Sequence, residues 1–557
     1  MVGARVVNSR LRLLLLAVLL VFGVLLVRAA WLQTVRASSL SARAQAQTKT
    51  SLVLPPGRGT IFDRLGTPLA ISEQATDVVA DPMQITQPRR EARIAAKVLG
   101  IKAGPLVTAL SDRRSQFVYV ERQAPPALAT ALAKKDLVGF TFQPSQRRDY
   151  PQGTVAAPLL GYAGYDKGLS GLEVELNKEL AGTSGRETVV RDALGHVVDT
   201  MQDRPAHNGH DVFLTIDSHI QADAEQVLTQ TVRQWQAKDA TAIVLDPHTG
   251  AVLALAQEPG YNANDFSQAY SRGLTIEHGI TDVYEPGSVF KVVTIGGALS
   301  DHDVTPQTTF RVPDTLQVAD RVIHDAEVHP TKTMTVAQIL QQSSNVGTVT
   351  IAERYLHEDG LKKWMARFGF GRPTGIDFPG ESAGLLPSYW SGSTIGNVPI
   401  GQGVSVTAIQ LASVYGAIAN DGEWIQPHLV DHVLGQEPPQ LRRRRILSPA
   451  VDETLRSMLR GVVSDQGTAE KASIPGYSVA GKTGTAQKPG PNGYMPGKYV
   501  ATFVGMVPSS NPRLVVLVSV DEPHGSIYGG LVAAPAFEKI ASFDLQYLQV
   551  PPDLRLH

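Results

Sequence analysis

The sequence predicts a mixed α/β protein in which one membrane-spanning helix precedes two further domains. Three observations lead to this fold class. The chain has 557 residues, too many for one ordinary hydrophobic core, which implies two or three domains. An uncharged apolar run follows basic residues at the N-terminus. The second half has strand-like segments near both of its ends and helical periodicity between them, the pattern of a sheet combined with helices.

The composition narrows the classes of function. Lys and Arg number 51 against 52 Asp and Glu, which argues against a nucleic-acid polyanion as the main partner. A hydrophobic content of 43% is that of a folded globular chain. The absence of cysteine rules out disulfides, thiol catalysis and zinc–thiolate sites, but it does not fix the compartment.

The N-terminal segment predicts export. Arginines among residues 1–12 precede the uncharged run 13–27. Counted as 13–32, the segment reaches the roughly 20 residues that a bilayer requires, with Arg28 snorkelling to the headgroups and Trp31 in the interface. The positive-inside rule then places residues 1–12 in the cytoplasm and the remainder outside. A signal peptide cleaved beside Arg28 is the alternative, and it also exports the rest of the chain.

The first half shows no catalytic constellation. Residues 33–54 are polar with spaced leucines and predict a short helical stalk or linker, ended by a Pro-Pro-Gly break. Residues 55–210 mix strand-like segments, such as 117–121, with alanine- and leucine-rich helical runs, such as 90–99. This pattern predicts a non-catalytic α+β domain.

The second domain is expected over residues 211–545, followed by a C-terminal tail, 546–557. The composition shifts at Asn208-Gly209-His210. Its predicted strands are residues 211–216, the hairpin of 242–245 with 252–256, and the pair 500–507 and 514–520; its helices include 220–235, 335–342 and 406–419. The basic run Arg442 to Arg445 is interpreted as a solvated surface loop.

Ser288 is the first candidate catalytic residue because Lys291 follows it by three positions. On a helix, residues i and i+3 share a face, so the amine can reach the hydroxyl. An alcohol needs an adjacent base, and lysine can serve if its pKa is lowered. Pro286 and Gly287 predict a turn that begins a helix at Ser288, whose backbone N–H groups can stabilise an oxyanion.

Ser343 and Asn345 form the second motif, Ser343-Ser344-Asn345. A hydroxyl and an amide two residues apart in a loop can point into one cleft. The same letters recur at Ser509-Ser510-Asn511, in a turn before Pro512, and that copy is attributed to turn formation.

Lys482, Thr483, Gly484 and Thr485 form the third motif. The alternating residues 477–480 predict that it lies on a strand. A lysine beside two hydroxyls can hold a carboxylate, and glycine lets a substrate backbone approach closely. A phosphate loop is excluded because no glycine-rich run precedes the lysine.

In this order the three motifs resemble the signature of penicillin-recognising serine enzymes. Residues 58–70, Arg148-Asp149-Tyr150-Pro151 and residues 168–173 resemble the pedestal, or dimerisation-type, domain of class B (monofunctional) penicillin-binding proteins. The resemblance implies an antiparallel sheet flanked by helices plus an all-helical subdomain, behind an elongated α+β pedestal. No glycosyltransferase domain fits.

Two branches of class B stay open. Residues 285–288, 342–347 and 529–535 look most like the septal cell-division D,D-transpeptidase. Residues 399–403 with Thr407 are shared with elongation-type relatives. In contrast to β-lactamases, no glutamate for a deacylating water can be identified.

The resemblance implies a peptidoglycan cross-linking reaction. Ser288 would form an acyl-enzyme with release of D-Ala, Lys291 would be its base, and Ser343 with Lys482 would relay a proton. Asn345 would orient the peptide amide. Lys482, Thr483 and Thr485 of the third motif would hold the terminal carboxylate, and Gly484 would let the substrate backbone approach. β-Lactams would acylate the same serine, and neither a metal nor an organic cofactor is implied.

The implied partners are stem pentapeptides of nascent glycan and a membrane-embedded glycan polymerase with other division proteins. The implied place is the bacterial cytoplasmic membrane, N-terminus inside and catalytic domain extracytoplasmic. Hydrolysis, as in a carboxypeptidase or β-lactamase, is the alternative outcome of the same site. A non-catalytic scaffold or a penicillin-sensing protein is the alternative from another class.

Overall fold

The computed structural model describes residues 2–39, 49–191, 197–491 and 493–554. Contacts divide the chain into two units, each built from separated segments. Unit 1 comprises residues 1–57, 74–146 and 182–208; unit 2 comprises 58–73, 147–181 and 209–557. This division differs from the single boundary expected near residue 210.

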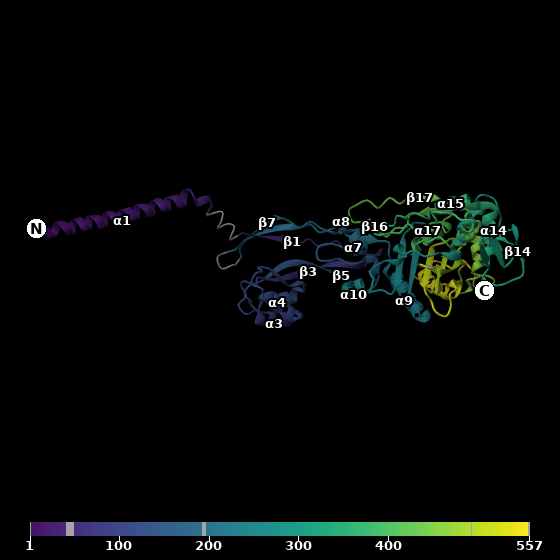
Figure 1. Cartoon of the computed structure of the whole chain (residues 1–557), viewed down its shortest axis with the longest axis horizontal. Helices are drawn as coiled ribbons and strands as arrows, with labels where there is room; N and C mark the ends of the chain where they lie inside the picture. The colour runs from purple at the N-terminus through teal and green to yellow at the C-terminus, as the bar shows by residue number, and fades with distance from the viewer. Residues whose placement is uncertain (1, 40–48, 192–196, 492, 555–557) are drawn as a thin grey trace. The chain divides into compact units, whose positions relative to one another are not determined.

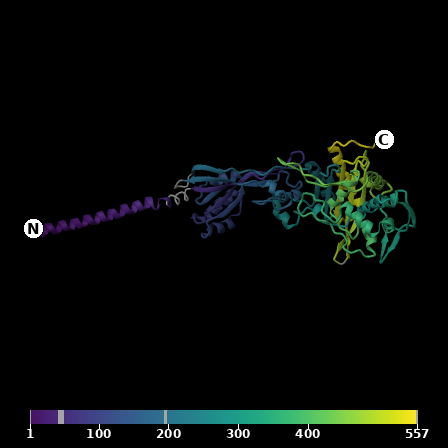
Figure 2. The ribbon, with the colours of Figure 1, turned by 90° about the horizontal axis from the view of Figure 1, so that it is seen from above.

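Helix α1, Val2–Thr34, is one unbroken helix in both ribbon views (Figures 1 and 2). Its 25-residue segment Arg10–Thr34 has a mean hydropathy of 2.8 and buries nothing against the protein, so it is long and apolar enough to cross a membrane. The Arg28 guanidinium lies 4.8 Å from the Trp31 ring centroid, consistent with an interfacial pair. Residues 40–48 of the expected stalk lie outside the described residues, and strand β1, Lys49–Leu54, occupies its end.

Unit 1 has a small hydrophobic core of its own. A three-stranded sheet has the order β1-β6-β7, with β6 at Gly185–Arg191 and β7 at Val197–Arg204. Elsewhere in the unit, helices α3 (Pro88–Leu99), α4 (Ala103–Ser111) and α5 (Pro126–Ala133) pack near strand β4 (Val118–Ala124). The predicted helix 90–99 and strand 117–121 are therefore present with shifted ends. Apolar faces of these helices form the core, which includes Val78, Leu99, Leu110 and Leu132.

Unit 2 contains a five-stranded antiparallel sheet in the order β10-β9-β20-β19-β18. The bounds are Val252–Glu258 for β10, Asp239–Leu245 for β9, Leu514–Asp521 for β20, Gly493–Val507 for β19 and Ala480–Gly490 for β18. Segments from both ends of the domain thus meet in one sheet, as Figure 1 shows for the yellow and teal strands and as the sequence predicted. The end of the sheet formed by β18 is an open edge.

Helices cover both faces of this sheet. Helix α20, Ala534–Tyr547, packs on one face, where the ring of Phe537 contacts Phe503 of β19. Helix α17, Ala408–Ile418, lies on the other face, where Gly416 approaches Leu245. Paired residues share a face, and the register aligns Lys482 with Val504, Leu517 and Ile243. Lys482 therefore lies on the α17 face, which also carries the helical part of the domain.

That helical part includes α12, α13, α14, α15 and α18, at Lys291–Ser300, Val336–Gln341, Asn345–Ile351, His357–Phe368 and Pro449–Val462. Helix α13 begins at a capping box in which Thr335 and Gln338 satisfy each other's backbone N–H groups. The predicted helices 220–235 and 406–419 are observed as α9 (Ser218–Trp235) and α17. Helix α9 buries apolar positions three and four residues apart, and α17 is buried on all sides.

Three expectations need correction. The strand predicted at 211–216 is β8, Val212–Leu214, and it pairs with β2 (Ile61–Phe62) and β16 (Val430–Val433) rather than with the five-stranded sheet. The expected strand at 477–480 does not form, because the chain turns there and β18 begins only at Ala480. The run Arg442 to Arg445 is largely exposed to solvent, as expected, but it is not a loop. Strand β17, Arg443–Arg445, pairs with β15, Glu423–Ile425.

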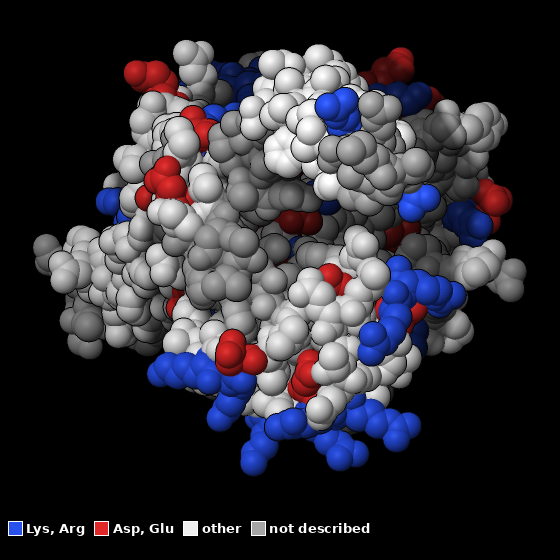
Figure 3. Space-filling view, turned by 90° about the vertical axis from the view of Figure 1, so that its left-hand side faces the viewer, with Lys and Arg blue, Asp and Glu red and all other residues white. Residues whose placement is uncertain are grey.

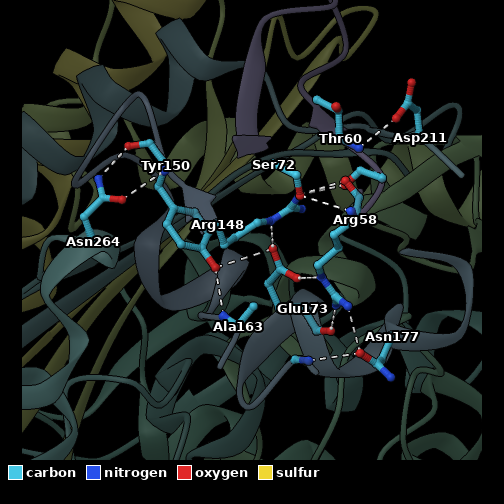
Figure 4. Close-up of polar contacts among 12 residues, drawn as sticks. Arg58, Thr60, Ser72, Arg148, Tyr150, Ala163, Glu173, Asn177, Asp211 and Asn264 are labelled. Atoms are coloured by element: carbon cyan, nitrogen blue, oxygen red, sulfur yellow. Dashed lines mark hydrogen bonds and ion pairs between the residues drawn. The ribbon is translucent and has the colours of Figure 1, made fainter. Parts of the chain in front are cut away.

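A buried ion cluster joins the early motifs within unit 2 (Figure 4). Glu173, whose side chain has no exposed surface, accepts from Arg58 Nε at 2.5 Å and from Arg148 Nε at 2.7 Å. Asn177 Oδ1 accepts from Arg58 at 2.9 Å, and the Tyr150 hydroxyl accepts from the Ala163 N–H at 2.9 Å. Two guanidiniums thus share the one buried carboxylate, which is their common counter-charge.

The surface carries charges of both signs. On the face drawn in Figure 3, acidic side chains lie among lysines and arginines, in keeping with the formal net charge of −1. A uniformly basic surface of the kind that binds nucleic acid is not seen on that face.

Candidate active site

Ser288 lies in a 3₁₀ turn, Gly287–Phe290 (η2), that leads into α12. The turn packs directly on strand β18. A Cβ at Gly484 would lie 2.8 Å from the Pro286 carbonyl oxygen, and a Cβ at Gly287 would lie 2.8 Å from that of Thr485. Only glycines permit this backbone contact, and Gly287 has a φ of 57°. The half-buried Ser288 is thereby held beside the edge strand.

Lys291 is fully buried one turn after Ser288. Its Nζ donates to the Ser343 carbonyl oxygen at 2.5 Å, to Asn345 Oδ1 at 2.8 Å and to Ser343 Oγ at 3.3 Å. Burial and the nearby charge of Lys482 lower the pKa of Lys291 well below its usual range, although Asp325 acts in the opposite direction. A lysine in this environment can be neutral and act as a base.

The second motif is positioned by a strained turn and a helix start. Ser343 has a φ of 59°, a left-handed conformation that is uncommon for a serine. Ser344 caps helix α14 by accepting from the Gly347 N–H at 2.9 Å, so Asn345 is the first residue of that helix and not part of a loop. The helix start turns the Ser343 hydroxyl and the Asn345 amide toward Lys291.

Lys482, from the third motif, reaches the same Ser343 hydroxyl that Lys291 contacts. Its Nζ donates to Ser343 Oγ at 2.8 Å, and its side chain is fully buried. Burial lowers the pKa of Lys482 to about 7. Thr483 Oγ1 lies 2.7 Å from Thr468 Oγ1, while Thr485 Oγ1 accepts from the Gly529 N–H at 3.3 Å. Two amines thus converge on one hydroxyl.

Asp325 is a site residue that the motifs did not reveal. Its carboxylate accepts from Ser344 Oγ at 2.8 Å, from the Val346 N–H at 3.0 Å and from His329 Nε2 at 3.0 Å. The hydrogen bonds to Ser344 and Val346 hold the start of helix α14, which carries the second motif, in position. Nothing in the local sequence of Asp325 marked it, since it lies 18 residues before Ser343 and belongs to no recognised spacing.

Glu285 belongs to the segment 285–288 that carried the resemblance, but the sequence assigned no role to its side chain. One carboxylate oxygen accepts from the Gly403 N–H at 2.9 Å and the other from the Tyr494 hydroxyl at 2.8 Å. Burial raises the pKa of Glu285, and the two hydrogen bonds oppose that shift. Glu285 therefore ties the turn before Ser288 to the hairpin that ends β18.

The second Ser-Ser-Asn copy, Ser509-Ser510-Asn511, makes its recorded hydrogen bonds elsewhere and not with Lys291 or Lys482. Ser509 Oγ donates to Ser478 Oγ at 2.7 Å, and Ser510 Oγ donates to Asp553 Oδ2 at 2.6 Å. Both hydroxyls are used to pack a turn against the C-terminal segment. This copy has the turn role that the sequence predicted.

The arrangement supports acyl transfer. It places a hydroxyl on a helix-leading turn, a buried lysine able to be neutral, a second hydroxyl within reach of two amines, and an edge strand beside the turn. Lys291, Ser343, Asn345 and Lys482 are joined by direct hydrogen bonds, while Pro286 and Gly287, just before Ser288, pack against the backbone of Gly484 and Thr485.

Comparisons with known proteins agree with this geometry. Residues 240–542 match the family described as the penicillin binding protein transpeptidase domain, and residues 53–214 match the penicillin-binding protein dimerisation domain. The chain is 32% identical to the peptidoglycan D,D-transpeptidase FtsI of Escherichia coli K12, over 99% of this chain and 94% of the relative. It is 36% identical to penicillin-binding protein PbpB of Mycobacterium tuberculosis, over 94% of this chain and 82% of the relative.

Solved structures are similar over most of the chain. The aztreonam complex of penicillin-binding protein 3 from M. tuberculosis aligns with a TM-score of 0.72 at 30% identity, covering 90% of this chain and 98% of that one. The ampicillin complex of the same protein gives the same values. Its apolar N-terminal helix and its similarity to FtsI fit a single-pass membrane protein. The chain belongs to the class B penicillin-binding proteins, in which a dimerisation domain precedes a transpeptidase domain.

Proposed function

We propose that this protein is a peptidoglycan D,D-transpeptidase that cross-links stem peptides through an acyl-enzyme on Ser288. The observation that carries the proposal is the convergence of Lys291 and Lys482 on Ser343 Oγ, at 3.3 and 2.8 Å. One amine can accept a proton while the other keeps a positive charge, which is the division of roles that acyl transfer to and from a serine requires.

In the first step, Ser288 Oγ attacks the carbonyl carbon of the penultimate D-Ala, and Lys291 takes the hydroxyl proton. The backbone N–H groups of Ser288 and Thr485 stabilise the oxyanion. The C–N bond to the terminal D-Ala then breaks. Ser343, hydrogen-bonded to Lys482, passes a proton to the departing amine, which leaves as free D-Ala.

Substrate binding uses the second and third motifs. Asn345 orients the peptide amide. Lys482, Thr483 and Thr485 hold the terminal carboxylate through charge-assisted hydrogen bonds, and Gly484 leaves room for the substrate backbone. The amine of a second stem peptide then attacks the acyl carbon, restores Ser288 and completes a 4→3 cross-link. β-Lactams take the place of the donor peptide and acylate Ser288, and the reaction then stops at this acyl-enzyme.

The biological setting is proposed from the relatives. The full-length similarity to FtsI supports a role in septal wall synthesis. Basic residues before the apolar helix support a cytoplasmic N-terminus and an extracytoplasmic catalytic domain in the bacterial cytoplasmic membrane. A membrane-embedded glycan polymerase and other division proteins would be the partners. Residues 55–210 would form the pedestal and 211–545 the transpeptidase domain.

The test is product analysis with the full-length protein, lipid II and a glycan polymerase. Cross-linked muropeptides should appear with the wild type and with Ser509→Ala, and should vanish with Ser288→Ala and fall sharply with Ser343→Ala. The Ser509 variant is a matched control because it removes the same hydroxyl from the second Ser-Ser-Asn copy. Release of D-Ala without cross-links would show hydrolysis instead. Cross-linking that survives Ser288→Ala would overturn the proposal.

A further inference from the structure

An arginine-lined cavity of about 320 Å³ lies in unit 2 outside the three motifs. It is formed by the end of α15, the segment after it, α17 and the β15–β17 hairpin. Four arginines line it, Arg372, Arg442, Arg443 and Arg444, together with apolar side chains that include Phe370, Val414 and Trp424. Among the described residues that line it, none is an aspartate or glutamate. We call it the arginine cavity.

Backbone carbonyl groups hold three of these guanidiniums in place. Arg442 donates to the Thr374 carbonyl oxygen at 2.5 Å, and Arg444 donates to that of Phe368 at 3.1 Å. Arg372 donates to the Ala366 carbonyl oxygen at 3.3 Å. A carbonyl satisfies one donor but does not neutralise the charge, and each guanidinium has five N–H groups.

Two glycines make room for this arrangement. A Cβ at Gly375 would lie 2.0 Å from a terminal nitrogen of Arg442, and a Cβ at Gly369 would lie 2.3 Å from one of Arg444. Both glycines have positive φ, 84° and 103°. The guanidiniums thus lie flat against bare backbone, where their orientation is fixed before any ligand arrives.

The positive charge of the cavity is largely uncompensated. Glu423 lies 3.8 Å from Arg443, and this surface pair is the ion pair recorded for the four lining arginines among the described residues. Glu381, nearby in sequence, is occupied by hydrogen bonds from the N–H and hydroxyl of Thr374 and the N–H of Gly375. The Nε of Arg444 is buried without a hydrogen-bond partner in the described part of the chain, an unusual state for a charged donor.

These features define the ligand chemistry. Planar guanidiniums bind oxyanions in a bidentate manner, and three of them supply more charge than a single carboxylate neutralises. The Arg444 guanidinium already lies over the Trp424 ring, 4.4 Å from its centroid, so an apolar wall adjoins the charged one. We propose that the arginine cavity binds a phosphate or pyrophosphate group whose organic part packs against Trp424 and Val414. The site is independent of the acyl-transfer reaction.

The test uses the full-length protein in nanodiscs of zwitterionic lipid, titrated calorimetrically with inorganic pyrophosphate. The wild type should bind, and binding should weaken as the salt concentration rises. Arg442→Gln and Arg372→Gln should each weaken binding roughly tenfold or more, since each removes a charge-assisted hydrogen bond. Arg372→Gln guards against misfolding because the Arg372 side chain is exposed and its recorded hydrogen bond is the long one to the Ala366 carbonyl oxygen.

The matched control is Arg445→Gln. Arg445 belongs to the same basic run and donates to the Asp421 carbonyl oxygen, but it does not line the cavity. This variant loses the same unit of charge and should bind pyrophosphate within about twofold of the wild type. No binding by the wild type, or equal loss with Arg445→Gln and Arg442→Gln, would overturn the proposal.

A second arm identifies the source of the phosphate. In nanodiscs that contain phosphatidylglycerol, a lipid headgroup in the cavity would compete with pyrophosphate and reduce its apparent affinity in the wild type. Unchanged affinity would assign the site to a soluble phosphate compound. Either result supports the site, provided that Arg442→Gln removes pyrophosphate binding in both kinds of disc. A fluorescent penicillin should label every variant equally and so report correct folding.

Discussion

Lys482 Nζ and Ser343 Oγ lie 2.8 Å apart, and Lys291 Nζ lies 3.3 Å from the same hydroxyl oxygen. Two buried ammonium ions so close repel each other, so the pair loses one proton readily. Lys291 gives up its proton first, since the pKa of Lys291 is lowered further by the charge of Lys482. The working state is therefore a neutral Lys291 beside a charged Lys482.

This state predicts a bell-shaped pH profile for acylation by a fluorescent penicillin. The second-order rate constant should rise as Lys291 becomes neutral, because a base must be unprotonated. It should fall as the pH passes the pKa of Lys482, about 7, because the drug carboxylate then loses its positive partner. Stopped-flow measurement from about pH 5 to about pH 9 gives the profile. A rate that keeps rising to the alkaline end contradicts the assignment.

Asp325→Asn should shift the ascending limb of that profile to lower pH. The carboxylate of Asp325 favours the charged form of Lys291, so its removal lowers the pKa of Lys291 further. The rate constant at the optimum should also fall roughly tenfold, because Ser344 and Val346 lose a charged acceptor. Asp320→Asn, at a largely exposed neighbouring position, should leave the profile unchanged. Identical profiles for both variants would rule out this role of Asp325.

Glu173→Gln should destabilise the protein strongly. It leaves Arg58 and Arg148 buried without a counter-charge, a loss of about 3–5 kcal/mol. Differential scanning fluorimetry should show a melting temperature lower by roughly 5 °C or more. Glu73→Gln is the control, because its pair with Arg147 has the same 2.7 Å distance but both side chains are 42% exposed. That change should cost under about 1 kcal/mol. Equal shifts would show that burial is not the cause.

Glu277→Gln should raise stability at alkaline pH. Burial raises the pKa of Glu277 to about 8 from an ordinary value of 4.5. The folded state therefore prefers the neutral acid, and its stabilisation is complete below pH 4.5 and is lost as the pH rises to about 8. Glutamine mimics the neutral acid, so the melting temperature at about pH 9 should rise by several degrees, with little change at about pH 5. Glu453→Gln, at an exposed position, should have no such pH-dependent effect.

Gly484→Ala should slow acylation roughly a hundredfold, because a methyl group 2.8 Å from the Pro286 carbonyl oxygen must push strand β18 away from the Ser288 turn. The melting temperature should change much less than the rate. Gly260→Ala is the control, since its added Cβ would meet only a backbone oxygen at 3.8 Å. A similar loss of rate in both variants would point to a general effect of alanine.

The sequence alone predicted the helices and strands whose formation depends on a local pattern of residues. The apolar runs 500–507 and 514–520, which bracket a turn, predicted β19 and β20, and Pro286-Gly287 predicted the turn that leads into a helix at Ser288. Prediction from the sequence failed where the sheet to which a strand belongs depends on its pairing partners. Strand β8 has the apolar pattern of any buried strand, and only its partner β2, 150 residues earlier, excludes it from the five-stranded sheet.

The sequence also provided no correct account of the arginine run 442–445 or of Asp325, because the roles of both depend on contacts with distant parts of the chain. Charge suggested a solvated loop at 442–445; the segment is largely exposed, but it forms strand β17, and the bare backbone at Gly369 and Gly375 accommodates two of its guanidiniums. Asp325 is important only because the chain folds it against Ser344. Neither relationship has a spacing that one sequence can display.

The interleaving of the two units limits how this protein can be shortened. A fragment that begins at residue 211 keeps all three catalytic motifs but lacks Ile61–Phe62, the strand beside β8. It also lacks Arg58, Arg148 and Glu173, and it lacks Thr60, whose N–H donates to Asp211 at 2.7 Å. Such a fragment would expose an unpaired strand edge and buried apolar surface to water. Recombinant work on the catalytic centre therefore needs a chain that starts ahead of residue 58, and removal of the N-terminal helix is the truncation that this topology permits.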